Sequence, residues 1–513
     1  MKRQKLYIVI ASIVLASVCT ACKKVDNEPV SSYSMTVDAV RTKTLSDNGS
    51  AISSTWTAGD EVTVWSSDGT TTQYGTLTAA GSGSSTTLSG TLSLLPADGE
   101  TLLLKYLSPD YANQDGTLTG SAASIDKLCD YATATVTAMV SGNSVTTTDA
   151  AFESQQAILK LTIKNSSGSD ITSTITKLTI IDIDGAKSYQ VTPSSLSTIY
   201  VALPAASSDR LAFIANDGTA NYRKAVTGKT LNAGHLIPVS LSTLYAGALT
   251  GAFTAASSQL VYFSEGNLQA KTTDLGAHWI WAFAPAQYAC VGDNAANTTI
   301  SGSMTLSENG TVDLFGWNAA DSTEDNYGIN NSTDNADYDT SGTTLKNDWG
   351  HNPIANGGGT ADAWRTMSHA DWASILTNRS ASTVCGTANA RFAIARVNEV
   401  SGIILFPDNY QHPSGVAELK NINTAIAVAS CENSIDLGQW TYMEAAGAVF
   451  LPCAGFRLGT TVSRVNQYVR YWTNANNKTQ ARSVYYNNET QITHNNAMDR
   501  RYGCAVRLVQ DVN

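Results

Sequence analysis

The chain has 513 residues, which is too long for a single hydrophobic core, so two to four domains are expected. Charged residues make up only 15% of the chain, and the formal net charge is −11. Because affinity for phosphate backbones and for anionic membrane faces comes from Lys and Arg, this composition argues against nucleic acid and against an anionic membrane face as partners.

The first residues have the pattern of an export signal. Basic residues within the first five positions precede an almost wholly apolar run over residues 6–18, and Ala21 stands before Cys22. The apolar run is too short to span a bilayer, which takes about 20 residues, so we predict a signal peptide over residues 1–21. Cleavage before Cys22 resembles the processing of bacterial lipoproteins and implies a lipid anchor on that cysteine. A secreted protein without lipid, cut nearby, is the alternative.

The next part of the chain has the composition of short strands. Residues 22–35 are polar and contain Pro29, which predicts a tether. From residue 36 to 245, apolar stretches are separated by Gly, Asp, Asn and Ser, and this spacing predicts β-sandwiches. A strongly apolar strand begins near residue 150, so we divide this part into residues 36–150 and 151–245. Three stretches alternate with period two, namely residues 61–65, 157–164 and 177–183.

Two motifs in this part resemble one known family. Residues 56–62 carry the motif Trp-x-x-Gly-Asp-x-Val, and residues 232–239 are similar to a closing strand. Over residues 35–245 the chain resembles the fimbrillin-like family of surface lipoproteins and pilins, which implies two stacked β-sandwich subdomains. In some members a protease cuts after an early Arg, and the groove then takes a strand from the next pilin. Arg41 is the candidate cleavage site, and an exposed loop arginine is the alternative.

The composition changes in residues 246–513, which contain most of the tryptophans. Ser368 is a good N-cap, an Asp follows in the first turn, and apolar residues share one face, so a helix is predicted over residues 368–376. A weaker helical signal lies around residues 443–446. Residues 400–407 read as a buried strand.

Eight segments of this part follow, in order, the pattern of one bacterial family. They are residues 261–269, 313–317, 348–350, 364–367, 402–408, 447–457, 471–473 and 501–509. The chain here resembles the major paralogous domain of bacterial surface lipoproteins, a family related in fold to C-type lectins and to formylglycine-generating enzymes. The expected fold is therefore mainly β, with two fimbrillin-like β-sandwich subdomains followed by an α+β C-type-lectin-like domain over residues 246–513.

The cysteines give one departure from that family. Small residues usually stand where this chain has Cys453 and Cys504, and both lie in predicted core strands. The departure implies a disulfide, which requires Cα atoms about 4.4–6.8 Å apart. Two buried free thiols are the alternative. A pair between Cys385 and Cys431 is a weaker hypothesis.

Residue patterns typical of catalysis are few. A reactive thiolate needs a partly exposed, electropositive setting, which Cys453 and Cys504 do not promise, and no Gly-x-Ser-x-Gly elbow occurs. We therefore predict no enzyme, no cofactor and no metal. Residues 321–339 are rich in the oxygen ligands that suit calcium, but they lack EF-hand order, and a solvated acidic loop is favoured.

The segment from Tyr471 to residue 500 is dense in Asn, Tyr and Arg. Tyr supplies rigid contact area and Asn supplies adaptable hydrogen bonds, as in antibody paratopes. In a lectin-like fold, strands at residues 471–472 and 504–509 would frame this segment on one exposed face. We predict ligand binding here, with ordinary polar turns as the alternative. The candidate residues are Asn474, Asn476, Asn477, Arg482, Tyr485, Tyr486, Asn487, Asn488, His494, Asn495, Asn496, Asp499 and Arg500.

These resemblances imply a lipid-anchored protein of the outer membrane and cell surface, at a pilus tip or free of one. The expected role is a fimbrial tip or surface adhesin that binds a protein or glycan ligand through the C-terminal lectin-like domain. Other pilins are expected partners by strand addition, and contact with the membrane is through the lipid anchor only. The alternatives are an envelope enzyme of formylglycine-generating type and a structural pilus subunit, against which the large extra C-terminal domain counts.

Overall fold

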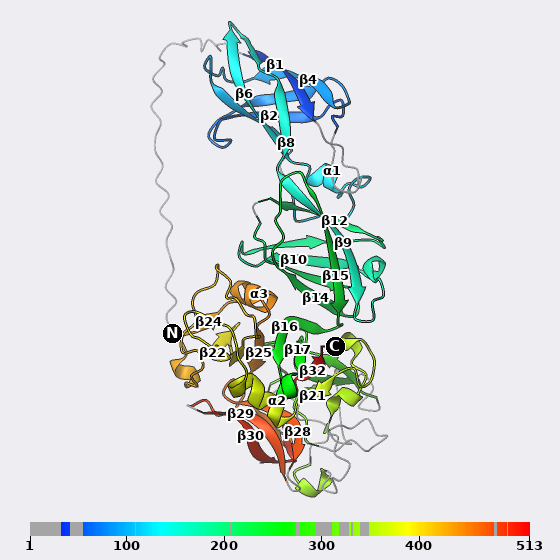
Figure 1. The fold of residues 1–513 in the computed structure, drawn as a ribbon, viewed down its shortest axis with the longest axis vertical. Helices are drawn as coiled ribbons and strands as arrows, with labels where there is room; N and C mark the ends of the chain where they lie inside the picture. Colours follow the sequence, from blue (N-terminus) through cyan, green and yellow to red (C-terminus); the bar gives the residue numbers. More distant parts are fainter. Residues whose placement is uncertain are drawn as a thin grey trace, which may run out of the picture.

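The computed structural model shows a mainly β protein built from three bodies along one long axis (Figure 1). We name them the N-terminal β-domain (residues 32–107 and 132–154), the middle β-domain (109–131 and 156–245) and the C-terminal domain (246–512). The structure describes residues 32–41, 55–107, 109–205, 207–272, 278–292, 310–317, 328–329, 332–338, 348–476, 480–489 and 491–512. The predicted signal peptide, Cys22 and most of the predicted tether lie outside these residues.

The N-terminal β-domain is a sheet that closes on itself. Its strands follow the order β4-β3-β2-β5-β6-β7-β1-β8, and β1 also pairs with β4, which completes the ring. Strand β1 already begins at Tyr33, within the predicted tether, because Met35, Val37, Ala39 and Arg41 alternate into the core. The strands are β1 (Tyr33–Arg41), β2 (Glu61–Ser66), β3 (Gln73–Ala79), β4 (Ser85–Leu92), β5 (Thr101–Tyr106), β6 (Ala132–Ser141), β7 (Ser144–Thr147) and β8 (Ala150–Ser154).

The Trp-x-x-Gly-Asp-x-Val motif forms the turn that leads into β2. Trp56 is buried, with its ring edge-on to Tyr106 at 5.5 Å and to Phe152 at 5.1 Å between centroids. Gly59 has φ +95°, a conformation that other residues rarely adopt. The Asp60 carboxylate accepts a hydrogen bond from the backbone N–H of Thr57 at 2.8 Å and holds the turn. The motif therefore serves the core of this domain.

The middle β-domain has two sheets that enclose one core, with orders β11-β10-β13-β14 and β12-β9-β15. Strand β9 is buried on both faces, since Leu159 and Leu161 face the sheet-to-sheet core while Ile158 faces helix α1 (Ile125–Leu128). This explains its strongly apolar sequence. The strands are β9 (Gln156–Asn165), β10 (Lys177–Asp182), β11 (Lys187–Val191), β12 (Ile199–Pro204), β13 (Leu211–Asn216), β14 (Asn221–Val226) and β15 (Leu236–Leu244), with a short helix at Thr172–Thr174.

The two β-domains are tied together by the segment between β5 and β6. Within it, the Gln114 side chain donates to the carbonyl of Ala202 at 2.9 Å and accepts from its N–H at 2.7 Å. Ile125 and Cys129 are fully buried against the outer face of β9 and β12. The change of sheet occurs between β8 and β9, close to the expected boundary at residue 150. The intervening segment nevertheless packs on the middle β-domain, which no linear division of the sequence predicts.

The described residues of the C-terminal domain form five small sheets around three core clusters. Its first strands pair with its last, since β17 lies antiparallel to β32. The strands are β16 (Ala248–Thr254), β17 (Leu260–Ser264), β18 (Leu268–Thr272), β19 (Ile280–Phe283), β20 (Gly310–Val312), β21 (Arg365–Thr366), β22 (Phe392–Val397), β23 (Val400–Leu405), β24 (Ser434–Ile435), β25 (Val449–Pro452), β26 (Phe456–Leu458), β27 (Thr461–Ser463), β28 (Val469–Asn476), β29 (Gln480–Tyr486), β30 (Ile492–Asp499), β31 (Tyr502–Gly503) and β32 (Leu508–Asp511).

Helices are short in this domain. Helix α2 (His369–Ala373) begins at a capping box in which Ser368 and Asp371 bond each other's backbone, as its sequence predicts, and it continues as a π-turn (η7, Ser374–Asn378). Helix α3 (Leu437–Ala445) begins earlier than its weak signal. Within the described part of the chain, no helix is both long and apolar enough to cross a bilayer. Short 3₁₀ turns lie at Ala256–Ser258, Asn335–Asp337, Trp349–His351, Ala355–Gly357 and Val428–Ser430.

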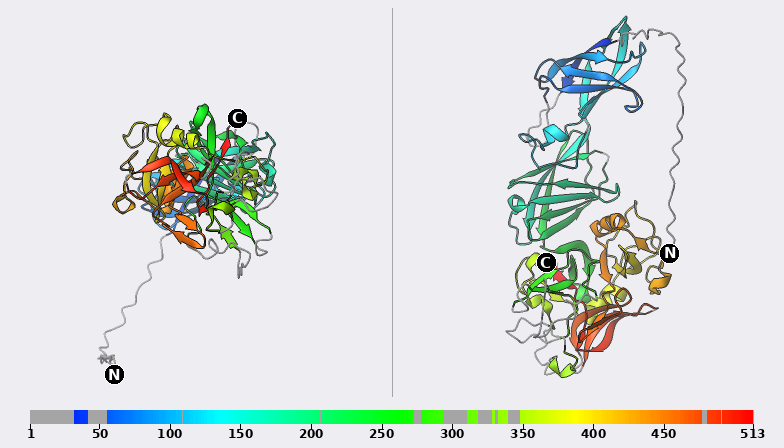
Figure 2. Two further views of the ribbon diagram at one scale, coloured as in Figure 1. Left: turned by 90° about the horizontal axis from the view of Figure 1, so that it is seen from below. Right: turned by 180° about the vertical axis from the view of Figure 1, so that it is seen from behind.

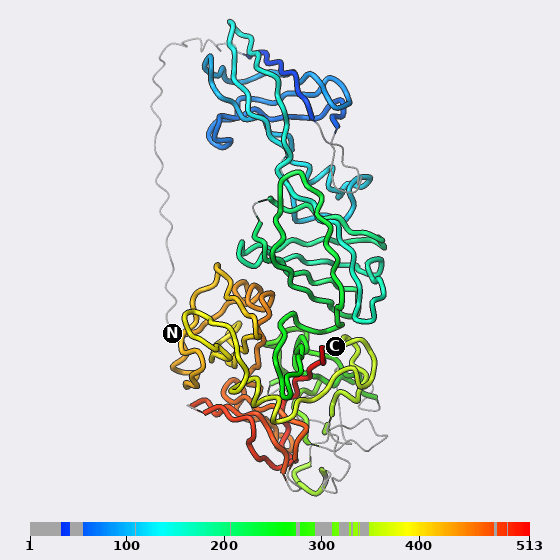
Figure 3. The backbone as a smooth tube through the Cα atoms, viewed as in Figure 1, coloured from blue at the N-terminus to red at the C-terminus, as the bar shows by residue number. Residues whose placement is uncertain are grey.

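The middle and C-terminal domains share a partly apolar, partly ionic interface. Glu265 and Arg223 form an ion pair at 2.6 Å whose side chains are 4% and 10% exposed. Ala445 of α3 packs on Ile181 and Ile183 of the middle β-domain. Strand β32 returns to this junction, whereas β28–β30 lie at the opposite end of the C-terminal domain (Figure 3). The view from behind shows the same order of the three bodies (Figure 2).

Candidate ligand-binding face

The predicted ligand segment forms one antiparallel sheet, β28-β29-β30, at the end of the molecule farthest from the N-terminal β-domain (Figure 1). Both faces of this sheet contact the core. Tyr471, Val484 and Tyr486 pack in the same cluster as Trp372 of α2, and Trp472, Ala481 and Met498 pack in a second cluster with Trp317. We call the remaining exposed and half-buried side chains of β28–β30 and their turns the distal face.

Most of the candidate residues reach this distal face. Asn495 is exposed, and the others of this group are half-buried. They come from all three strands and from the turn after β29, so the sheet gathers residues separated by up to 25 positions. The group comprises Asn474, Asn476, Arg482, Tyr485, Asn487, Asn488, His494, Asn495, Asn496 and Asp499. Asn477 lies outside the described residues.

Two candidate residues are core residues instead. Tyr486 is fully buried, and its hydroxyl donates to the carbonyl of Ile426 at 2.5 Å. Arg500 is also fully buried, with its guanidinium 4.8 Å from the centroid of the Trp317 ring. Tyr486 follows the core residue Val484 by two positions in β29, so the two side chains lie on the same side of the strand. The prediction of ligand contact is therefore wrong for these two residues.

Some side chains on the distal face already have structural partners. The Asn488 side-chain oxygen accepts from the backbone N–H of Val428 at 2.6 Å. The Asn496 oxygen accepts from Arg470 at 3.3 Å, and Asp499 forms an ion pair with Arg501 at 3.3 Å. Removing these side chains would therefore disturb the sheet as well as its surface.

A row of aromatic rings and arginines, missed by the sequence analysis, borders this sheet. The Arg470 guanidinium lies 4.0 Å from the Tyr485 ring centroid and 5.4 Å from that of Phe456. Tyr468 meets Tyr485 edge-on at 5.6 Å, and Tyr502 meets Phe456 at 5.6 Å. Alternation in residues 468–471 predicts that Tyr468 and Arg470 share a face, but only the fold brings Phe456 beside them.

A cavity of about 350 Å³ opens between β30, the π-turn after α2 and the start of β22. Its lining includes Ile492 and His494 from the predicted segment. The opposite wall comes from Leu376, Arg391 and Phe392, which lie about 100 residues earlier in the chain. The sequence gives no signal for this meeting, because it depends on long-range packing. We call this cavity the Arg391 pocket.

His494 has an unusual setting in that pocket. Its Nδ1 atom is buried and has no hydrogen-bond partner among the described residues. Burial, aided by the nearby His369, lowers the pKa of His494 below its ordinary value. The neutral ring is therefore favoured in the folded protein.

The implied disulfides are not formed. Cys453 and Cys504 are free and fully buried, and they lie in different core clusters. Burial raises the pKa of Cys504 to about 12, and it also raises that of Cys453. Cys385 and Cys431 are free as well. The two replacements at positions 453 and 504 act as small core hydrophobes, because each fits a separate cluster.

Arg41 is not an exposed loop residue. Its side chain is 3% exposed and pairs with the buried Asp130 at 2.6 Å. Its guanidinium also lies 3.9 Å from the centroid of the Tyr106 ring. Arg41 ends β1, opposite Phe152 of β8. A protease reaches this bond only when the strand opens, so cleavage after Arg41 stays a prediction that the folded conformation opposes.

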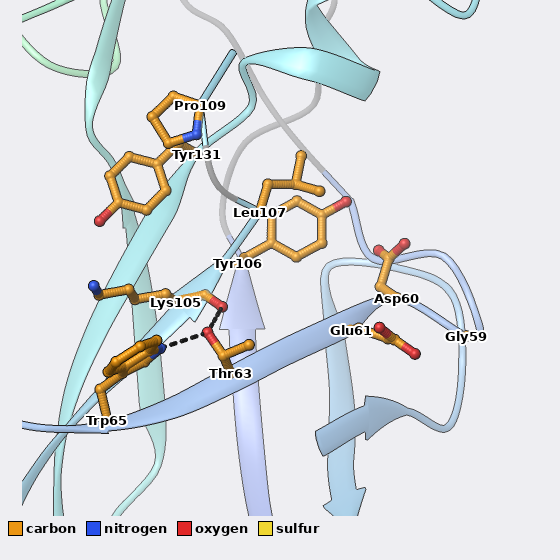
Figure 4. A pocket seen from close by; sticks show the side chains of 10 residues that line it. All are labelled: Gly59, Asp60, Glu61, Thr63, Trp65, Lys105, Tyr106, Leu107, Pro109 and Tyr131. Atoms are coloured by element: carbon orange, nitrogen blue, oxygen red, sulfur yellow. Dashed lines mark hydrogen bonds between the residues drawn. The ribbon is translucent and has the colours of Figure 1, made fainter. Parts of the chain in front are cut away.

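A second cavity, of about 520 Å³, lies in the N-terminal β-domain beside the Gly-Asp turn (Figure 4). Lys105 places its ammonium 4.7 Å from the Trp65 ring centroid. The Trp65 indole donates to the Thr63 hydroxyl at 2.9 Å, and that hydroxyl donates to the Lys105 carbonyl at 3.4 Å. Asp60 and Glu61 come from the other side of the cavity. The central polar groups of this cavity therefore already have hydrogen-bond partners within the domain.

Metal-binding geometry is not evident in the described segments, where no three His, Cys, Asp or Glu side chains gather. Much of the acidic loop over residues 321–339 lies outside those segments. Asp334 of that loop caps a short 3₁₀ turn by accepting from the backbone of Ala336.

Comparisons with known proteins give only weak likenesses. No family model matches the chain, and no curated protein matches it. A Bacteroides ovatus protein with an inferred role in cell adhesion is 15% identical, covering 41% of this chain and 94% of its own, with a TM-score of 0.26. A fimbrial protein from Bacteroides ovatus is 11% identical, covering 94% and 99%, with a TM-score of 0.22. The shaft pilin SpaA of Lactobacillus rhamnosus GG is 8% identical, covering 41% and 98%, with a TM-score of 0.19. At such scores these likenesses carry no argument about this chain.

Proposed function

We propose that this protein is a surface-displayed adhesin that binds a protein or glycan ligand at its distal face. The observation that carries the proposal is the position of β28–β30, which gather Asn, Arg and Tyr side chains at one extremity of a three-body molecule (Figure 1). Side chains of these types form adaptable binding surfaces. The two β-domains then act as a spacer between the anchor and the ligand.

The anchor and the fold of the C-terminal domain belong to the same proposal. The N-terminal sequence supports export and a lipid on Cys22, which would place the protein at the cell surface of the outer membrane. Pairing of β17 with β32, which brings the two ends of the domain together, is in keeping with a C-type-lectin-like fold. The fimbrillin-like motifs support a pilus tip as one site of display, with other pilins as partners.

The formylglycine-generating alternative loses its main support. That reading needs an exposed, reactive cysteine pair, whereas Cys453 and Cys504 are buried apart from each other. Burial raises both pKa values, and the thiolate is the reactive form.

A structural pilus subunit is the remaining alternative. Strand β1 supports it, because four of its side chains fill the core in the manner of an exchangeable strand. A pilus subunit without a ligand would not need the distal face.

The test is a binding screen of the full mature chain against host-protein and glycan arrays. A variant with Arg482, Tyr485, Asn487 and Asn495 changed to Ala removes distal side chains without touching the buried Tyr486. A control variant changes the exposed Lys187 and Ser188 of β11 to Ala. Binding that the first variant loses and the control retains supports the proposal. Equal binding by all three chains would refute it.

A further inference from the structure

The Arg391 pocket contains a cation that the fold leaves without a counterion. Arg391 donates through Nε to the carbonyl of Arg379 at 2.9 Å, and it makes no ion pair among the residues that the structure describes. The neighbouring Arg379 is different, because Asp408 neutralises it at 2.7 Å. In a chain with 43 acidic and 32 basic residues, an unpaired arginine at the wall of a cavity is suited to receive an anion.

Four of the eight residues that line the pocket are apolar. Leu376, Phe392, Ala425 and Ile492 line it, and the first two are at most 8% exposed. The volume of about 350 Å³ is within the range of small-molecule sites, about 300–1,000 Å³. A ligand that fills it would therefore bury a compact apolar group.

Two other polar side chains of the pocket, Asn423 and Thr377, already have partners, whereas the buried Nδ1 atom of His494 has none among the described residues. The Asn423 side chain accepts from the backbone N–H of Arg391 at 2.8 Å and donates to the carbonyl of Asn389 at 2.9 Å. The Thr377 hydroxyl donates to the carbonyl of Ala373 at 2.6 Å. A sugar ring needs partners for several hydroxyl groups. These commitments favour a ligand with one charged group and an apolar body.

We propose that the Arg391 pocket binds a carboxylate attached to a compact apolar group, held through the Arg391 guanidinium and the apolar lining. The carboxyl terminus of a peptide that ends in an apolar residue has this chemistry, and so does a free apolar acid. The inference deepens the proposed adhesin function and rests on it for its biological meaning. The pocket's chemistry can be tested without it.

The experiment is a calorimetric titration of the full mature chain with N-acetylleucine and with its neutral amide. The acid is expected to bind at least about tenfold more tightly, because a charge-assisted bond is lost in the amide. Arg391→Gln is expected to lower the affinity for N-acetylleucine by about tenfold or more. Arg464→Gln, at an exposed site, is expected to leave that affinity unchanged. The peptide Gly-Gly-Leu, with a free or an amidated terminus, separates a peptide source from a free acid.

Three outcomes would overturn the proposal: no binding of the acid, equal binding of acid and amide, or full binding by Arg391→Gln. The comparison of acid with amide uses the unaltered chain, so it holds even where a variant fails to fold. Arg391→Lys, which keeps the charge but not the forked donor, is expected to bind with intermediate affinity. An array ligand that needs the distal face but not Arg391 would leave the adhesin function standing and would show that this pocket takes no part in it.

Discussion

In the N-terminal β-domain, Arg41 has a structural role that its position in the sequence does not predict. Arg41 stands at the end of a strand, yet it is a buried ion-pair partner of Asp130 and lies against the Tyr106 ring. Burial raises the pKa of Tyr106 to about 12, so this ring stays neutral beside the pair at ordinary pH.

We expect Arg41→Ala to lower the free energy of unfolding by about 3–5 kcal/mol, because it leaves Asp130 buried without its counterion. Denaturant unfolding of the full chain measures the loss. The matched control is Arg464→Ala at an exposed position. A loss below about 1 kcal/mol would mean that the pair is open to water in solution.

The buried thiols make a second prediction at this scale. Cys453 and Cys504 are expected to resist maleimide in the native chain, because neither is accessible. Both should react in denaturant without any reductant, since neither is in a disulfide. Mass mapping of the labelled peptides checks this. Labelling that appears only after reduction would show that the two cysteines form a disulfide.

At the scale of elements, local patterns predict local structure well. The alternating residues 61–65 and 157–164 lie in β2 and β9, and all but the last residue of the stretch 177–183 lies in β10. Ser368 caps α2 as its sequence suggests. These features depend on neighbours within a few positions, so the sequence alone contains them.

Features that depend on distant partners could not be predicted. Strand β1 closes the ring by pairing with β4 on one side and with β7 and β8 on the other. The polar residues before β1 predict a tether where this strand begins. Tyr486 is buried because the cluster around Trp372 covers the side of β29 that carries Val484 and Tyr486. The Arg391 pocket combines residues about 100 positions apart. For the candidate site, the sequence predicts the residue types and a strand at residues 471–472, but it predicts neither β29 and β30 nor the second wall of the pocket.

The contact between β30 and α2 predicts a pH effect. Because the pKa of His494 is lowered in the folded chain, the unfolded state takes up a proton first as pH falls through about 6.5. The contribution of the neutral His494 ring to the free energy of unfolding is complete above that pH and is lost as the pH falls below it. His494→Gln is therefore expected to show a smaller loss of stability between pH 7.5 and 5.5 than the unaltered chain.

Thermal unfolding across this pH range measures the difference. The control is His235→Gln, which removes an exposed histidine from the turn before β15. An identical pH dependence in the His494 variant and the unaltered chain would show that the ring is freely solvated.

For the whole molecule, the interface between the middle and C-terminal domains decides whether the distal face is held away from the N-terminal β-domain. Glu265 is central to it, since it accepts from Arg223 at 2.6 Å, from Asn221 at 2.9 Å and from Asn356 at 2.9 Å. Such a buried, multiply bonded carboxylate stabilises one relative placement of the two domains.

Glu265→Ala is expected to loosen this interface by about 3 kcal/mol, because it leaves Arg223 buried and unpaired. Small-angle scattering should then report a broader distribution of molecular lengths. Glu432→Ala breaks an exposed pair with Lys420 and should have no effect. Unchanged scattering by both variants would show that apolar contacts alone hold the domains.

The central claim is that the ligand binds at the end farthest from the N-terminal β-domain. Hydrogen exchange of the full chain, with and without a ligand found on the arrays, tests it most directly. The account predicts protection in residues 469–499, with or without residues 376–392 of the facing wall. Protection confined to residues 32–154 would contradict it and would favour a role in which the C-terminal domain binds nothing.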